Sequence, residues 1–193
     1  YSFNRSTNHA AMAISKAKNP IILAGNGVIR ADATEALIEF ATQLNIPVAN
    51  TFMGKGAIPY THPLALWVVG LQQRDVINCA FEQTDLVIAV GYDLVEFSPK
   101  RWNPKGTIPI IHIGITSAEI DSSYIPLVEV VGDISDSLIE ILKRTDRHGK
   151  PTPSAAKLRP DIVQEYESYA DDREFPIKPQ KLIYDLRREM GPE

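Results

Sequence analysis

The run Leu86–Val90 limits the possible folds of this 193-residue chain more than any other stretch. It is an uninterrupted apolar run, rich in β-branched residues, and it ends abruptly at Gly91. Such a run is typical of a strand buried on both faces of a parallel sheet. Polar, aromatic and charged residues follow it: Tyr92, Asp93, Glu96, Lys100, Arg101 and Trp102. Open α/β sheets bind ligands outside the carboxyl ends of their strands, which makes this loop a candidate functional segment. A core strand followed by a solvated loop explains the same pattern.

Further apolar runs alternate with segments of helical periodicity along most of the chain. Strands are predicted at 20–24, 46–51, 86–90, 108–115 and 127–131, with a short additional one possible at 66–69. Helices are predicted before the first strand, capped by Ser6 or Asn8, and then at 32–44, 73–82 and 133–145, with Asp32 and either Asp133 or Ser135 as caps. This alternation is the signature of right-handed βαβ units. The predicted fold class is therefore α/β, a doubly wound, parallel, five- or six-stranded sheet flanked by helices and Rossmann-like.

The domain organisation follows from where this alternation begins and ends. Residues 1–8 are polar and are assigned to a linker, 9–145 to the central Rossmann-like domain, and 146–178 to a linker containing a helix. Pro179 opens a last helix with apolar residues at helical spacing, and 179–193 are assigned to the truncated start of another domain. We expect the chain to be a piece of a longer protein.

The composition excludes several classes of function. A net charge of −4 gives no electrostatic case for binding nucleic acid or an anionic membrane. The single Cys79 excludes an internal disulfide and a thiolate zinc site, and it fits a reducing cytoplasm. No apolar run approaches the roughly 18 residues that a membrane-spanning helix needs. We therefore expect a cytoplasmic protein without nucleic-acid or membrane partners.

Gly25-Asn26-Gly27 directly follows a predicted strand, where glycines would let the backbone approach a pyrophosphate. The dinucleotide fingerprint is incomplete, because Arg30 occupies the third glycine position. The second predicted strand also lacks a terminal acidic residue that would bind a ribose. A tight strand-to-helix turn without a ligand is the favoured interpretation.

Other candidate crevice residues follow the later strands. They are Gly91, Tyr92 and Asp93 after the central strand, and Gly132 and Asp133 after the last one. Asp133 is explained equally well as a helix cap. The histidines have no metal-ligand spacing, and His112, within an apolar strand, is expected to be a satisfied core residue. We assign no catalytic and no metal-binding residue to this chain, because no catalytic triad, nucleophile elbow, P-loop or carboxylate pair is present.

Four segments carry a family resemblance: Ala17–Gly25, Thr51–Gly56, Asp85–Gly91 and Val131–Asp133. In this order they resemble the central domains of thiamine-diphosphate-dependent enzymes, and acetolactate synthases most. The resemblance covers about residues 9–145, and the helix at 179–190 is similar to the start of the C-terminal thiamine-diphosphate-binding domain of these enzymes.

The resemblance implies a parent enzyme that condenses two pyruvates to 2-acetolactate and CO₂ with thiamine diphosphate and Mg²⁺. It implies flanking N- and C-terminal thiamine-diphosphate domains and a homodimeric or homotetrameric parent. It also implies that this fragment is a non-catalytic central domain, which is inactive alone and binds none of these cofactors.

The pattern from Gly91 to Asn103, together with 119–134, looks like the catabolic, FAD-independent acetolactate synthases. The biosynthetic branch carries an arginine and an acidic residue where this chain has Asp93 and Gly114. An aspartate facing a diphosphate would repel it, so FAD is not expected. We expect Tyr92, Phe97 and Trp102 to close part of the crevice. Two alternatives remain: the FAD-binding central domain of a relative (biosynthetic acetohydroxyacid synthase, pyruvate oxidase or glyoxylate carboligase), or a free-standing nucleotide-binding module.

Overall fold

The computed structural model describes residues 3–70, 79–147 and 150–190, which form two compact units, Tyr1–Leu158 and Arg159–Glu193. The first unit contains a six-stranded sheet with the order β3-β2-β1-β4-β5-β6, and every pair of neighbouring strands is parallel. The strands are β1 (Pro20–Ala24), β2 (Val48–Asn50), β3 (Ala65–Val68), β4 (Leu86–Val90), β5 (Ile110–Gly114) and β6 (Val128–Val131). The predicted α/β fold class is confirmed, and the short strand considered possible at 66–69 is the edge strand β3.

The centre of the sheet is the pair β1 and β4, as the apolar run Leu86–Val90 predicted. All residues of both strands are buried, and the pairing sets Ile22 opposite Ile88. The strand order reverses between these two strands, so the loops that follow them leave toward opposite faces of the sheet. In open α/β sheets such a reversal marks the ligand position, a crevice outside the carboxyl ends of the two strands, here β1 and β4.

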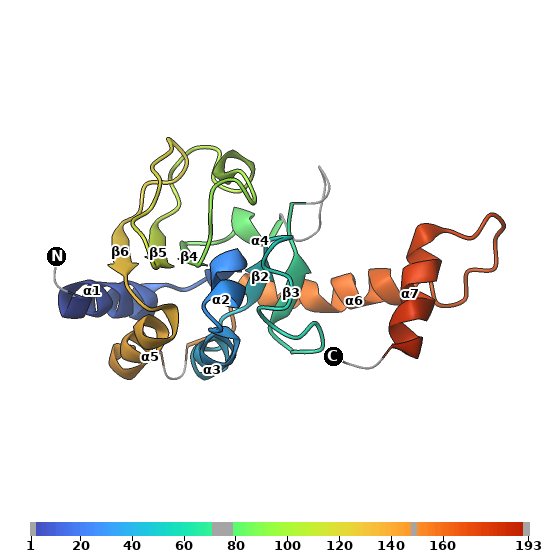
Figure 1. Ribbon diagram of the computed structural model, residues 1–193, viewed down its shortest axis with the longest axis horizontal. Helices are drawn as coiled ribbons and strands as arrows, with labels where there is room; N and C mark the ends of the chain where they lie inside the picture. The colour runs from blue at the N-terminus through green and yellow to red at the C-terminus, as the bar shows by residue number, and fades with distance from the viewer. Residues whose placement is uncertain (1–2, 71–78, 148–149, 191–193) are drawn as a thin grey trace. The chain divides into compact units, whose positions relative to one another are not determined.

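Among the described residues, the helices α1 (Phe3–Lys16), α3 (Thr34–Leu44) and α5 (Ile134–Arg144) cover one face of the sheet (Figure 1). Alternate strand residues point toward them and form the larger core, including Ile22, Ile88, Ile111, Ile113 and Val130. The other residues of β1 and β4 are buried against the opposite face, where α4 (Cys79–Glu82) packs against the 3-10 helix η3 (Ser154–Leu158). The short helix α2 (Asn26–Arg30) starts directly at the crevice.

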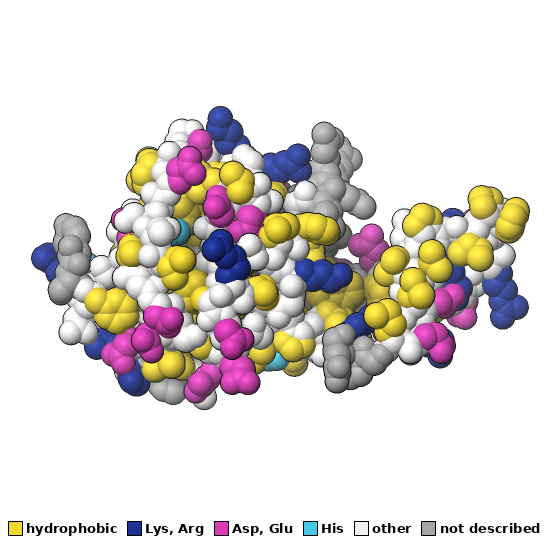
Figure 2. All heavy atoms as spheres, in the orientation of Figure 1, with side chains coloured by type: hydrophobic (Ala, Val, Ile, Leu, Met, Phe, Trp, Pro, Cys, Tyr) yellow, Lys and Arg dark blue, Asp and Glu magenta, His cyan; other side chains and the backbone are white. Residues whose placement is uncertain are grey.

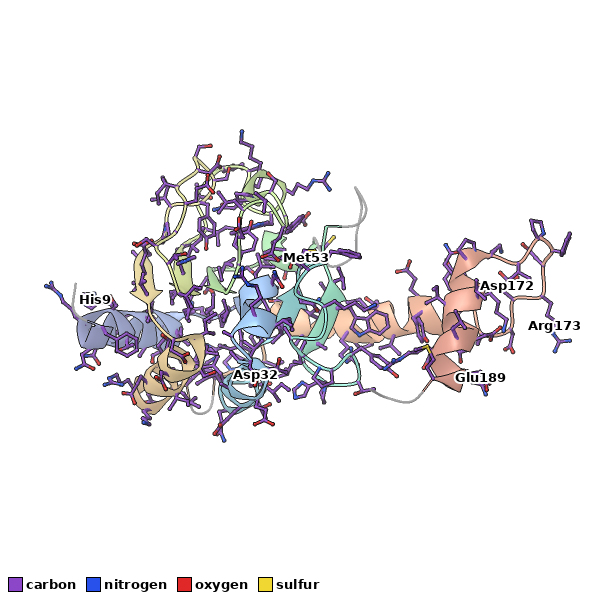
Figure 3. All side chains as sticks on the ribbon, in the orientation of Figure 1. His9, Asp32, Met53, Asp172, Arg173 and Glu189 are labelled. Atoms are coloured by element: carbon purple, nitrogen blue, oxygen red, sulfur yellow. The ribbon has the colours of Figure 1, made fainter. Side chains whose placement is uncertain are left out.

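Some predicted boundaries differ from the observed ones. Residues 3–8, which we assigned to a linker, form the first turns of α1, so neither Ser6 nor Asn8 caps the start of that helix. Asp32 lies in the turn between α2 and α3 with a left-handed backbone (φ 51°), and Ala33 occupies the N-cap of α3 (Figure 3). The expectation that Asp32 caps α3 was therefore wrong. The predicted helix at 73–82 falls partly on 71–78, which lie outside the described residues.

Arg147 binds the segment after α5 to the ends of α1 and α3. Its side chain is 6% exposed, and its guanidinium donates to the carbonyls of Leu44 (3.1 Å) and Ala17 (2.6 Å). These carbonyls lie at the C-terminal ends of α3 and α1, where cations are favoured. The first unit therefore extends to Leu158, although the sequence predicted that the domain would end near residue 145.

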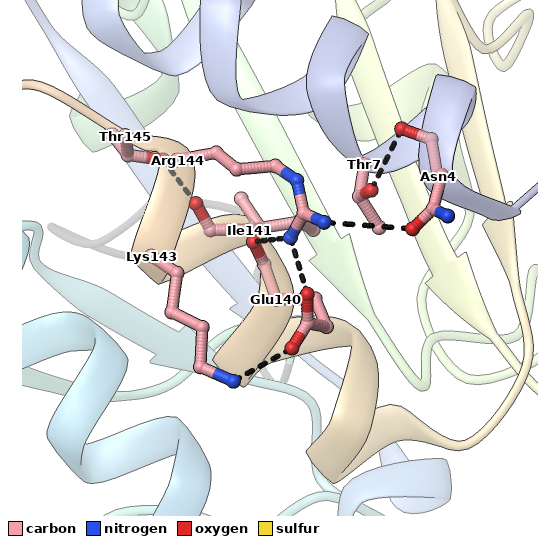
Figure 4. A network of polar contacts seen from close by, with 7 residues as sticks. All are labelled: Asn4, Thr7, Glu140, Ile141, Lys143, Arg144 and Thr145. Atoms are coloured by element: carbon pink, nitrogen blue, oxygen red, sulfur yellow. Dashed lines mark hydrogen bonds and ion pairs between the residues drawn. The ribbon is translucent and has the colours of Figure 1, made fainter.

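A polar network joins α5 to α1 on the surface (Figure 4). Glu140 accepts from Lys143 (2.7 Å) and forms an ion pair with Arg144. Arg144 also reaches the side-chain oxygen of Asn4 at 3.4 Å, and the Thr7 hydroxyl donates to the carbonyl of Asn4 at 3.0 Å. The contacts fix the first turn of α1 onto α5 at the edge of the helical layer.

The second unit contains α6 (Arg159–Glu167) and α7 (Pro179–Glu189), which contact each other through the rings of Tyr166 and Tyr184, 5.1 Å apart. Pro179 begins α7 as predicted, and α6 lies within 146–178, the segment that was predicted to contain a helix. The apolar side chains of α7 are exposed, and Figure 2 shows apolar atoms gathered over this unit. The large apolar side chains of α7 that are exposed are those of Leu182, Ile183 and Leu186.

No helix in the described part of the chain is both long and apolar enough to cross a membrane.

Candidate functional site: the crevice at the carboxyl ends of β1 and β4

Glycines bring the turns after β1 and β4 into direct contact. The amide of Gly25 donates to the carbonyl of Val90 (2.9 Å), and that of Gly27 donates to the carbonyl of Gly91 (2.8 Å). A Cβ on Gly25 would lie 2.5 Å from the Gly91 oxygen, and one on Gly91 would lie 2.5 Å from the Val28 nitrogen. Gly91 also has a positive φ of 57°. The packing of the two turns therefore requires these glycines, whether or not a ligand binds.

The carboxylate of Glu96 occupies the crevice in front of these turns. The backbone N–H of Asn26, in the first turn of α2, donates to its Oε1 (3.2 Å) and Oε2 (3.0 Å). The hydroxyl of Thr51, at the end of β2, donates to Oε2, and the N–H of Asp93 donates to Oε1 (3.2 Å). A Cβ on Gly25 would lie 3.0 Å from Oε1. One side chain thus joins the loops after β1, β2 and β4.

This arrangement determines which ligand chemistry the crevice favours. Dinucleotide-binding sheets place a pyrophosphate at the equivalent strand-to-helix turn, where backbone N–H groups point at the anion. In this chain the N–H of Asn26 already has an anionic acceptor, the carboxylate of Glu96. The hydroxyl of Thr51, which is fully buried, is bonded to the same carboxylate. The crevice is therefore closed by an anion that belongs to the protein.

The structure brings together six of the eight predicted crevice residues. At the reversal of the strand order the turn of Gly25, Asn26 and Gly27 contacts Gly91 and the backbone of Tyr92. The N–H of Asp93 donates to the same Glu96 carboxylate as the N–H of Asn26. Asp93 is exposed at the rim, where its carboxylate accepts from the N–H of Val95 (3.2 Å). The loop after β2 runs beside the crevice, and Met53 extends from it, 55% exposed (Figure 3).

Gly132 and Asp133 lie elsewhere. They follow β6 at the edge of the sheet, and β5 separates β6 from β4. A Cβ on Gly132 would lie 3.3 Å from the ring of Phe3 in α1. Asp133 is the N-cap of α5, and its carboxylate accepts from the N–H of Asp136 (2.9 Å). The helix-cap interpretation of Asp133 is the one that the structure supports.

The aromatic residues of the β4 loop form a buried cluster. Tyr92, Phe97 and Trp102 are 3–4% exposed, and the hydroxyl of Tyr92 donates to the carbonyl of Phe97. The Trp102 ring lies 5.5 Å from that of Phe81 and 6.2 Å from that of Tyr124. Burial raises the pKa of Tyr92 well above its usual range, so this phenol is neutral. These side chains support the loop from inside, whereas Glu96 fills the crevice.

His112 on β5 is a satisfied core residue, as its apolar context suggested. Its Nε2 lies 3.1 Å from the carbonyl of Thr116, and its Nδ1 lies 2.9 Å from the hydroxyl of Tyr124. A carbonyl can only accept, so Nε2 carries the hydrogen and Nδ1 accepts from Tyr124. Burial lowers the pKa of His112, although the Thr116 carbonyl and Glu129 act in the opposite direction.

Sequence reasoning missed the roles of Glu96 and Arg147. Glu96 was recognised only as one polar residue of the loop after the central strand, and Arg147 was placed in a linker.

The described residues contain no group of three His, Cys, Asp or Glu side chains that could hold a metal ion. A pocket of about 200 Å³ is lined by Leu44, Leu142 and Arg147 among others, at the C-terminal ends of α3 and α5. It lies toward the amino ends of the strands, whereas the crevice lies at their carboxyl ends, because α3 and α5 each follow a strand and run back along the sheet.

Comparison with known proteins identifies the family. Residues 7–141 match the family described as thiamine pyrophosphate enzyme, central domain. The chain is 34% identical to the probable acetolactate synthase large subunit of Methanococcus aeolicus, over 94% of this chain and 32% of that protein. It is 35% identical to the probable acetolactate synthase large subunit of Methanocaldococcus jannaschii, over 92% of this chain and 30% of that protein.

The catabolic acetolactate synthase of Raoultella terrigena is 30% identical, over 90% of this chain and 32% of that protein. The chain thus spans about a third of the length of the curated relatives that it matches. The resemblance found in the sequence is confirmed, and the chain belongs to the family of central domains of thiamine pyrophosphate enzymes.

Proposed function

We propose that this chain is the non-catalytic central domain of an acetolactate synthase. The full protein would condense two pyruvates to 2-acetolactate and CO₂ with thiamine diphosphate and Mg²⁺. Support comes from relatives named acetolactate synthase that are similar over 90% or more of this chain. The cofactor, when bound, supplies a nucleophilic carbon and an electron sink for decarboxylation.

The residues of this chain do not fit thiamine diphosphate with Mg²⁺. A diphosphate-bound Mg²⁺ needs oxygen ligands arranged around it, and the described residues contain no suitable cluster. In the crevice the backbone donors already have a protein carboxylate as partner. In the proposed parent the cofactor would therefore be bound by flanking N- and C-terminal domains. This domain would position them and border the site.

The exposed face of α7 supports a domain that continues beyond this fragment. Leu182, Ile183 and Leu186 are about half exposed, although they lie at helical spacing on an amphipathic helix. A pair of short helices gains little stability unless such a face is packed. We propose that 179–193 begin the C-terminal thiamine-diphosphate-binding domain, and that the parent is a homodimer or homotetramer in the cytoplasm.

The position of Glu96 is the single observation that supports a domain independent of FAD. Two like unit charges about 4 Å apart repel by about 4 kcal/mol at an effective dielectric of about 20. Since about 1.4 kcal/mol is a tenfold change in affinity, a diphosphate beside this carboxylate would bind several hundredfold more weakly. The diphosphate would also have to displace Glu96 from the N–H of Asn26 and from Thr51. The alternative, an FAD-binding central domain of a relative, requires this displacement.

The direct test is a titration of the purified chain with FAD, followed by flavin fluorescence and by the melting temperature. We expect neither signal to change and the protein to be colourless on purification. Micromolar binding, or yellow protein, would refute FAD independence and favour the biosynthetic or oxidase relatives.

The activity part of the proposal needs a separate assay. Acetolactate should form from pyruvate when the full-length parent is supplied with thiamine diphosphate and Mg²⁺. The chain described here should give no product above a control without protein. Product from this chain alone would contradict its assignment as non-catalytic, and an inactive parent would contradict the assignment to acetolactate synthase.

A further inference from the structure

The loop between β5 and β6, residues 115–127, is bound at both ends by one imidazole. Near its start, the carbonyl of Thr116 accepts from Nε2–H of His112 at 3.1 Å. Near its end, the hydroxyl of Tyr124 donates to Nδ1 at 2.9 Å. His112 is 6% exposed and Tyr124 is fully buried. Both ring nitrogens are thus used, and Tyr124 can be the donor only to the neutral tautomer with hydrogen on Nε2.

Protonation would reverse the direction of one of these hydrogen bonds. An imidazolium carries hydrogen on both nitrogens, so Nδ1–H would point at the oxygen of Tyr124 and the phenolic hydrogen would have to turn away. The surroundings of this phenol are aromatic, with the Tyr92 ring at 5.4 Å and the Trp102 ring at 6.2 Å. The described residues give the Tyr124 hydroxyl no hydrogen-bond partner other than His112. A buried donor without an acceptor is unfavourable, so the closed loop disfavours the charged ring.

The charged groups around His112 do not reverse this preference. Glu129 on β6 lies opposite His112 in the strand register, but its carboxylate accepts from the N–H of Ala118 (2.7 Å). Asp121, within the loop, accepts from the N–H of Ser123 (2.8 Å). On the β4 side the register partner is Ala89. Tyr92 and Tyr124 are neutral, because burial raises the pKa of both phenols. Burial of the ring outweighs the carboxylate of Glu129, and the pKa of His112 is lowered.

We propose that His112 is an acid-sensitive latch, which closes the loop 115–127 when neutral and releases it when protonated. The loop carries four apolar side chains that are 63–64% exposed, on Ile115, Ile120, Ile125 and Leu127. Acid would therefore loosen an apolar surface beside the edge strand β6 and leave the central strands in place. The proposal concerns this domain alone and does not depend on the activity of the parent.

Hydrogen exchange followed by mass spectrometry tests the latch on the chain itself. Exchange in peptides from 115–127, corrected for the intrinsic pH dependence, is compared with exchange in β1 and β4 between neutral pH and about pH 5. Opening that takes up one proton should become more frequent as the pH falls, by at most about tenfold per pH unit. The central strands should show no such increase. Loop exchange that is independent of pH over this range would overturn the proposal.

Two variants separate a latch from a merely structural contact. Tyr124→Phe removes the donor to Nδ1 and so destabilises the closed loop with a neutral ring more than the closed loop with a charged ring. Loop exchange should therefore rise more at neutral pH than at about pH 5, so that the variant shows a shallower pH dependence than wild type. His112→Gln removes the titrating group and should abolish the pH dependence. A purely structural role predicts that Tyr124→Phe loosens the loop equally at every pH, and that result would refute the latch. His9→Gln, on the exposed side of α1, is the matched control and should behave as wild type.

Discussion

The Glu96 contact makes a quantitative prediction about stability. In Glu96→Ala the N–H of Asn26, the hydroxyl of Thr51 and the N–H of Asp93 all lose their common acceptor. Thr51 is fully buried, so its hydroxyl carries the larger penalty, about 1–3 kcal/mol for a buried donor left unsatisfied. Asn26 is half-buried and Asp93 is exposed, so water can replace most of what they lose. We expect a total loss of about 2–4 kcal/mol in the free energy of unfolding.

Urea denaturation at neutral pH measures this loss, with the slope m as a check that the variant still unfolds in one step. Glu96→Gln keeps the size of the side chain and one acceptor oxygen, so we expect a loss of only about 1 kcal/mol. Glu119→Ala is the control, because Glu119 is exposed, and it should change stability by less than about 0.5 kcal/mol. If Glu96→Ala behaved like this control, the carboxylate would not hold the three loops together, and the closed crevice would have no energetic basis.

Three further predictions use other parts of the first unit. Ile88→Ala should cost about 2–5 kcal/mol through lost burial and a cavity, and a measured loss under about 1 kcal/mol would contradict the central position of β4. Arg147→Met should cost about 2–4 kcal/mol in urea denaturation, because the carbonyls of Leu44 and Ala17 lose their donor, and a neutral result would mean that water replaces the guanidinium. Stability should also fall as the pH drops below about 6.5, because the pKa of His112 is lowered in the folded state and the unfolded chain binds more protons. Thermal melts across this range should show a shallower decline in His112→Gln, and identical slopes would contradict the assignment.

Local signals predicted much of the fold. The continuous apolar run Leu86–Val90 could only be buried on both faces, and it is the central strand. Asp133 stands directly before a helical apolar pattern, and it is the cap of α5. Asp32 stands in the same kind of position but has a left-handed backbone in the turn between α2 and α3, and Ala33 is the N-cap. Spacing alone did not distinguish these two aspartates.

The residues that define the crevice depend on contacts between distant parts of the chain. Glu96 and Asn26 are 70 positions apart, and nothing in the spacing around Glu96 indicates which donor its carboxylate reaches. The sequence did offer one signal for the crevice. Gly25 and Gly91 each directly follow a predicted strand, and the turns after β1 and β4 lie side by side in the structure. Arg147 was hidden by its context of polar and turn-forming residues, whose composition is that of a linker.

The position of Arg147 determines where the first unit can be cut. A fragment that ended at residue 145, as composition suggests, would leave the carbonyls of Ala17 and Leu44 without their guanidinium. It would also lose Ser154, whose N–H and hydroxyl both donate to the side chain of Asn19 at the start of β1. Truncation after Leu158 keeps all of these bonds. The shortest stable form of this domain is therefore longer than its α/β repeat, and limited proteolysis should cleave after residue 158 before it cleaves near 145.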